Sequence, residues 1–113
     1  MPSTRPPAAD EYPPAYADYV GRVPAGSDVL EVLGRQLEET SSRLAGIPED
    51  RGGFRYAADK WSVKEVVGHL SDVERIMVYR ALRFARGDTT PVAGFDENSY
   101  VPAAGADAAA WPA

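Results

Sequence analysis

Residues 60–86 read KWSVKEVVGHLSDVERIMVYRALRFAR, and this stretch decides the fold. Ser62 followed by Glu65 has the pattern of a capping box, in which each side chain accepts a hydrogen bond from the backbone N–H of the other residue. Apolar residues then recur at spacings of three and four, which predicts one amphipathic helix over residues 62–86. Its apolar stripe consists of Val63, Val66, Leu70, Val73, Met77, Ala81 and Phe84.

A second amphipathic pattern precedes this stretch and predicts a helix over residues 28–45. Asp28 and Glu31 form another capping pattern, and Gly46 followed by Pro48 is a stop signal. The inner face of this helix includes Leu30, Leu33, Leu37 and Leu44. We expect an all-α fold in which the two helices pack antiparallel, as a helical hairpin, through their apolar stripes.

Three regions follow from the distribution of residue types. Residues 1–26 form a Pro/Tyr-rich N-terminal segment, in which prolines prevent a long regular helix. Residues 27–100 form the helical domain, with a single helical turn expected at residues 95–100. Residues 101–113 are an Ala/Gly-rich tail, expected to be irregular or to be a truncated third helix.

Composition limits the classes of function. The chain has 113 residues, of which 44% are hydrophobic and 26% are charged, as in one small globular domain. Its net charge of -5 argues against a nucleic-acid or anionic-membrane partner. The absence of cysteine excludes disulfides, cysteine-ligated zinc and thiol nucleophiles. No signal-peptide pattern and no long apolar run occur, so we expect a cytoplasmic protein with no membrane partner.

His69 is the single histidine of the chain and falls on the flank of the apolar stripe. The residues alone favour a half-buried histidine bonded to a carboxylate or a carbonyl over a metal ligand. Two carboxylates lie within reach on the same helix, but Glu65 is expected in the cap and Asp72 is expected to pair with Arg75.

The N-terminal segment carries three tyrosines at spacings of four and three, which are Tyr12, Tyr16 and Tyr19. Such rings can line the mouth of a pocket. The residues alone favour the simpler alternative, that the rings cover apolar surface.

Several short sequence runs in and around the predicted long helix have the pattern of a known protein family. These runs are Lys60-Trp61-Ser62, His69-Leu70, Asp72-x-Glu74-Arg75, Tyr79-Arg80-Ala81-Leu82-Arg83, Ala85-Arg86-Gly87-Asp88 and Gly94-Phe95-Asp96-Glu97 with Tyr100. With them, the chain resembles the DinB/YfiT-like superfamily of small metalloenzymes over most of its length up to about Tyr100.

This resemblance implies a four-helix bundle of which the chain would be the first half. It also implies a divalent metal, zinc or nickel, held by three histidines, with His69 at the position of the ligand from the second helix. The other two ligands normally come from a His-x-x-x-His pair on the last helix. The chain has no second histidine. We therefore expect an incomplete metal site, in an N-terminal fragment or in a short relative that pairs with another chain.

Two functions follow as hypotheses. The first is a metal-dependent transferase of small thiols or a hydrolase acting on a small-molecule substrate, inactive as this chain alone. Tyr12, Tyr16, Asp96 and Tyr100 are its candidates for the substrate mouth. The alternative is a non-catalytic helical module that self-associates through its exposed apolar face, in the simplest case as a homodimer.

Overall fold

The computed structural model describes residues 5–111, which fold as two compact units, residues 5–44 and 45–111. Helices and turns account for all regular structure in the described residues, which contain no strand. The all-α prediction is therefore confirmed. Among residues 5–111, none of the helices combines the length and the apolar character that crossing a bilayer requires.

The first unit contains the 3₁₀ turn η1 (Pro14–Tyr16), the short helix α1 (Ala17–Gly21) and the long helix α2 (Val29–Ala45). Helix α2 confirms the helix predicted over residues 28–45. The carboxylate of Asp28 accepts hydrogen bonds from the backbone N–H groups of Leu30 and Glu31, at 2.8 and 3.4 Å. Leu30, Leu33 and Leu37 are 68, 55 and 69% exposed, so residues 5–44 leave most of the α2 stripe uncovered.

An ion pair closes the N-terminal segment of the first unit. The guanidinium of Arg5 donates to both carboxylate oxygens of Glu11, at 2.8 and 2.6 Å. The backbone N–H of Ala8 also donates to this carboxylate, at 2.7 Å. These donors, the guanidinium first, lower the pKa of Glu11 to about 2. The proline-rich segment thus has a defined local turn.

The second unit contains η2 (Glu49–Arg51), the long helix α3 (Val63–Ala85), α4 (Glu97–Ala104) and η3 (Ala106–Ala108). Helix α3 starts and ends within one residue of the helix predicted over residues 62–86. The predicted capping box is confirmed, because Ser62 Oγ accepts from Glu65 N and a Glu65 carboxylate oxygen accepts from Ser62 N, both at 3.0 Å.

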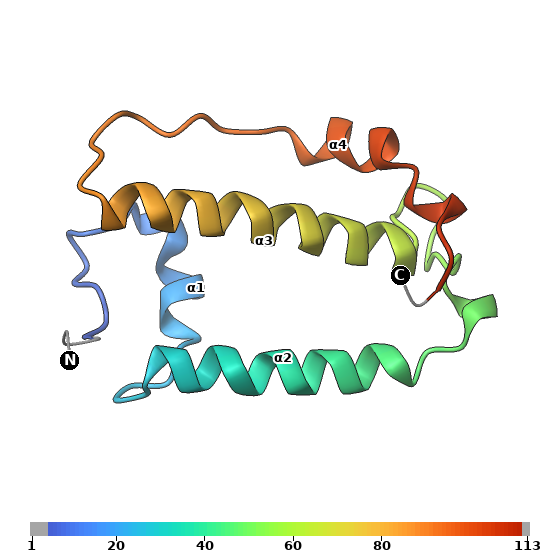
Figure 1. Ribbon diagram of the computed structural model, residues 1–113, viewed down its shortest axis with the longest axis horizontal. Helices are drawn as coiled ribbons and strands as arrows, with labels where there is room; N and C mark the ends of the chain where they lie inside the picture. The colour runs from blue at the N-terminus through green and yellow to red at the C-terminus, as the bar shows by residue number, and fades with distance from the viewer. Residues whose placement is uncertain (1–4, 112–113) are drawn as a thin grey trace. The chain divides into compact units, whose positions relative to one another are not determined.

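The chain turns back after α3, and α4 lies beside α3 and runs in the opposite direction (Figure 1). The sequence predicts a single turn over residues 95–100, whereas α4 continues to Ala104 with Pro102 inside it. Asp96 caps its start by accepting from Asn98 N at 3.0 Å, and Val101, 3% exposed, anchors it. Because this burial offsets the hydrogen bond lost at Pro102, the helix persists up to Gly105.

Contacts within the second unit involve one flank of α3. Arg80 and Arg83 donate to the carbonyl oxygens of Ala93 and Thr90, at 2.9 and 2.8 Å, which fixes the returning segment on this flank. Much of the predicted stripe lies outside these contacts: Val66, Leu70, Met77 and Phe84 are 42, 51, 46 and 66% exposed. The packing of the α3 stripe against α2 stays a prediction.

Candidate functional site

His69 lies in the first half of α3 and is half-buried. Its ring packs against the indole of Trp61, with the ring centroids 5.0 Å apart and the planes tilted by 48°. No side chain or carbonyl of residues 5–111 forms a hydrogen bond with the imidazole. The aromatic contact, not the hydrogen bond expected from the residues alone, therefore holds the ring, and both nitrogens are left for another partner.

The described residues do not assemble a metal site around His69. Residues 5–111 contain no group of three or more His, Cys, Asp or Glu side chains placed to hold a metal ion. Glu65 is engaged in the capping box and in an ion pair with Arg55. Asp72 lies 3.5 Å from Arg75 in an ion pair, as the sequence predicts. A catalytic metal requires about three protein ligands, and the described part of the chain offers one histidine.

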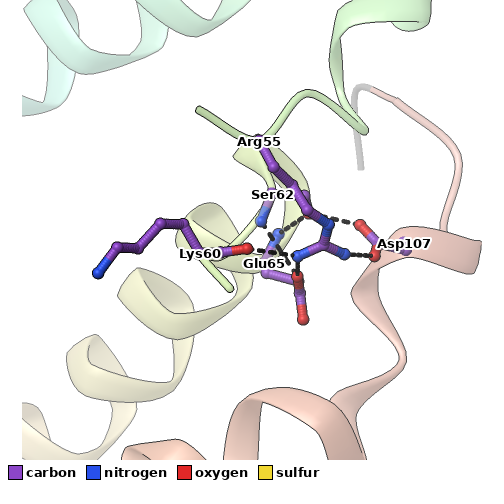
Figure 2. Close-up of polar contacts among 5 residues, drawn as sticks. All are labelled: Arg55, Lys60, Ser62, Glu65 and Asp107. Carbon is purple, nitrogen blue, oxygen red and sulfur yellow. Dashed lines mark hydrogen bonds and ion pairs between the residues drawn. The ribbon is translucent and has the colours of Figure 1, made fainter. Parts of the chain in front are cut away.

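A polar cluster occupies the start of α3 (Figure 2), and we call it the Arg55 cluster. It consists of Arg55, Ser62, Glu65 and Asp107, with the carbonyl oxygen of Lys60. The Arg55 guanidinium donates to the carboxylates of Glu65 and Asp107 and, at 2.8 Å, to the Lys60 carbonyl. Ser62 is fully buried and its hydroxyl donates to Asp107. The cluster therefore joins three segments that are distant in sequence.

The backbone N–H groups at the start of α3 have no acceptor within the helix, and they donate to other oxygen atoms of the chain. Val63 N donates to the carbonyl of Phe54 at 3.1 Å, and Lys64 N donates to that of Gly52 at 2.9 Å. Glu65 N donates to Ser62 Oγ. A helix start with free N–H groups attracts anions, but here protein oxygens already take those groups. The Arg55 cluster thus stabilises the folded second unit and is not a phosphate-binding site.

The C-terminal segment adds further stabilising contacts to this region. Lys64 Nζ donates to the carbonyl of Ala109 at 2.6 Å, and the indole N–H of Trp111 donates to that of Ile47 at 2.8 Å. A methyl group added at Gly68 would lie 3.3 Å from the Cβ of Ala106, so the small residue permits this close approach. Sequence reasoning missed these contacts because their partners are far apart in the chain.

The four candidates for a substrate mouth have other contacts in the structure. Tyr12 is half-buried, and Tyr16 packs on Tyr19 with ring centroids 6.4 Å apart. In the second unit, Asp96 caps α4 and Tyr100 packs on Phe95 with centroids 5.4 Å apart. Tyr19 lines an apolar cavity of about 480 Å³ in the first unit, whereas none of the four candidates lines a described cavity.

A cavity of about 310 Å³, whose lining residues are mostly exposed, lies beside Trp61 in the second unit, and we call it the Trp61 cavity. It is lined by Tyr56, Asp59, Lys60, Trp61, Val66 and Asn98. Three separate elements contribute these residues: the segment before α3, α3 itself and α4. Sequence reasoning missed this cavity, because nothing in the local pattern places Asn98 near Trp61.

The family model of the DinB superfamily matches residues 32–112. Comparisons with curated proteins and with solved structures give no match. The matched region covers more than half of the chain and contains α3, His69 and the Arg55 cluster. It agrees with the resemblance seen in the sequence runs around the long helix. The chain belongs to the DinB superfamily.

Proposed function

We propose that this chain supplies one ligand, His69, to the divalent-metal site of a DinB-type enzyme. The enzyme would transfer a small thiol or hydrolyse a small-molecule substrate. The observation that supports this is the state of His69: a half-buried imidazole held by Trp61, with no hydrogen bond from residues 5–111 to either nitrogen. Neutral imidazole is the commonest protein ligand for zinc-like metals.

The remaining ligands must come from outside the described residues. One imidazole leaves a zinc or nickel ion short of the three protein ligands that a catalytic site needs. Glu65 and Asp72 are already paired with arginines, so their recruitment would break those ion pairs. The chain by itself is therefore expected to bind metal weakly and to show no metal-dependent turnover.

Calorimetric titration of Zn²⁺ and of Ni²⁺ into the purified chain tests this proposal. We expect dissociation constants weaker than about 10 μM, since few ligands are present, and loss of the signal in His69→Ala. Asp72→Asn is the matched control and should bind as the wild type does. Weak binding that survives in His69→Ala would refute the ligand role. Submicromolar binding that depends on His69 would show that the chain holds a complete site.

A second candidate function, a self-associating helical module, is favoured by the open stripe of α3. Leu70 and Met77 are 51 and 46% exposed, and no residue of 45–111 covers them. An apolar stripe of this kind usually marks a contact surface. Sedimentation of the wild type should then show a dimer that dissociates in Met77→Glu. The exposed Glu74→Gln is the control. A monomer at every concentration would contradict this candidate.

A further inference from the structure

The Trp61 cavity has the size and the lining of a small-molecule site. Its volume of about 310 Å³ lies at the lower end of the range seen for ligand pockets. An indole ring and the Val66 side chain form apolar walls, and the other four lining side chains are polar. Four of its six lining residues come from the segment before α3, and α3 and α4 add Val66 and Asn98.

The polar side chains of the cavity are not used elsewhere in the described structure. Within residues 5–111, the side chains of Tyr56, Asp59, Lys60 and Asn98 form no hydrogen bond and no ion pair. The neighbouring Arg55 cluster uses the carbonyl of Lys60, whereas the Lys60 ammonium group points away from it (Figure 2). Asp59 and Lys60 thus bring opposite charges to one cavity without pairing with each other.

We propose that the Trp61 cavity binds a small zwitterion of the α-amino-acid type. The ligand carboxylate would bind the Lys60 ammonium, and the ligand ammonium would bind the Asp59 carboxylate. The apolar part would contact Trp61 and Val66. A ligand with one charge would leave the second charge of the cavity without a partner, and each charge-assisted hydrogen bond strengthens binding. A ligand with both charges matches the pair of side chains.

This binding goes beyond the metal proposal, because His69 does not line the cavity. The two sites nevertheless share Trp61, which lines the cavity and also contacts the imidazole of His69. A zwitterion in the cavity would therefore lie next to the candidate metal ligand. Occupancy of the cavity can be measured in metal-free protein, so the two proposals can fail separately.

Nuclear magnetic resonance of the full chain, freed of metal with a chelator, provides the test. The chain has two tryptophans, so the indole N–H signal of Trp61 can be followed while that of Trp111 serves as an internal reference. L-leucine is the probe. N-acetyl-L-leucine lacks the ammonium and L-leucinamide lacks the carboxylate. We expect L-leucine to move the Trp61 signal and each derivative to bind about tenfold more weakly, the effect of one lost charged contact.

Variants assign each charge to its partner. Asp59→Asn should weaken L-leucine about tenfold and leave N-acetyl-L-leucine unchanged, since that derivative has no ammonium to lose. Lys60→Met should do the same for L-leucine and leave L-leucinamide unchanged. Asp50→Asn, an exposed carboxylate outside the cavity, is the matched control.

Three outcomes would overturn the proposal. The first is no movement of the Trp61 signal at about 10 mM L-leucine, a concentration at which even a millimolar site would be occupied. The second is equal affinity for all three probes, which would indicate a merely apolar cavity. The third is a loss of affinity on removal of one charge but not of the other, which would indicate a singly charged ligand.

Discussion

The two ends of helix α3 are fixed by different kinds of contact. The first turn is held by residues distant in sequence: Phe54 and Gly52 accept its backbone N–H groups, and Asp107 accepts from the Ser62 hydroxyl. The last turn is held by the residues that directly follow it. Arg83 donates to Asp88 at 3.0 Å, and Asp88 N donates back to the carbonyl of Arg83 at 3.0 Å.

This difference shows which end of α3 depends on the rest of the second unit. Loss of the C-terminal segment would remove Asp107 from the first turn and leave part of the Arg55 cluster unpaired. The last turn would keep its contacts, because they span only a few residues. Substitutions at the first turn should therefore affect the stability of the whole unit, and substitutions at the last turn should act locally.

The largest effect is expected for Ser62→Ala. The hydroxyl of Ser62 accepts from Glu65 N and donates to Asp107, and the residue is fully buried. Loss of the cap and of the buried hydrogen bond should lower the free energy of unfolding by about 2 kcal/mol. Urea unfolding followed by circular dichroism measures this change. Ser71→Ala is the control on the same helix, because Ser71 is exposed and should change stability by less than about 0.5 kcal/mol.

A double-mutant cycle sharpens this prediction. If Ser62 and Asp107 act together, Asp107→Asn should cost less in the Ser62→Ala background than in the wild type. Additive effects would show that the two residues stabilise the unit independently. The start of α3 would then be held by its local cap alone, and the contrast between the two ends would disappear.

A smaller effect is expected for Gly52→Ala, beside the first turn. An added Cβ would lie 2.6 Å from Lys64 Cε, 3.1 Å from Lys64 Cγ and 3.3 Å from the Glu49 carbonyl oxygen. Lys64 would have to move away from the Ala109 carbonyl that it binds. Such crowding should lower the free energy of unfolding by about 1 kcal/mol, measured by thermal melting.

Gly53→Ala is the matched control for this change. Nothing lies within 4 Å of an added Cβ at Gly53. The substitution should be neutral or stabilise by up to about 1 kcal/mol, because alanine restricts the unfolded chain. Equal melting temperatures for the two variants would show that Lys64 moves away without cost and that the bond to Ala109 contributes little.

The sequence predicts the local features of α3 well and the distant ones poorly. The Ser62–Glu65 box has a fixed spacing of three residues, so its pattern is visible without a structure. Arg55 and Asp107 are 52 positions apart, and a pair this distant leaves no local pattern. The sequence predicts only one turn where α4 forms, because the residues from Val101 onward are rich in alanine and glycine, whereas burial of Val101 stabilises the helix.

The same difference between local and distant features applies to the candidate site. Helical spacing places His69 on the flank of the apolar stripe, and the structure shows it half-buried. Its contact with Trp61 could be foreseen only in part, because Trp61 precedes the helix and its ring direction depends on the cap. The Trp61 cavity needs Asn98 from α4, so it could not be predicted without the fold.

The smallest effect is expected at the other end of α3, for Asp88→Asn. The Arg83 guanidinium, followed by the backbone N–H and the hydroxyl of Thr90, holds the pKa of the Asp88 carboxyl well below its usual range. A carboxyl with a lowered pKa in the folded state stabilises the fold above its unfolded pKa of about 4, and this contribution is lost as the pH falls through the folded pKa. The wild type should therefore be slightly more stable than Asp88→Asn at pH 7, with a smaller difference at pH 3.

Urea midpoints of both proteins at the two pH values measure this difference, and Asp50→Asn, an exposed carboxylate of η2, is the control. Because the Asp88 carboxylate is exposed, high salt should also reduce the difference at pH 7. A difference as large as that of Ser62→Ala would contradict the contrast between the two ends, since it would make the local contacts of the last turn as important as the distant contacts of the first. A difference that does not change with pH would show that the asparagine amide replaces the contacts of the Asp88 carboxylate fully. The left-handed turn at Gly87 would then hold this end of the helix.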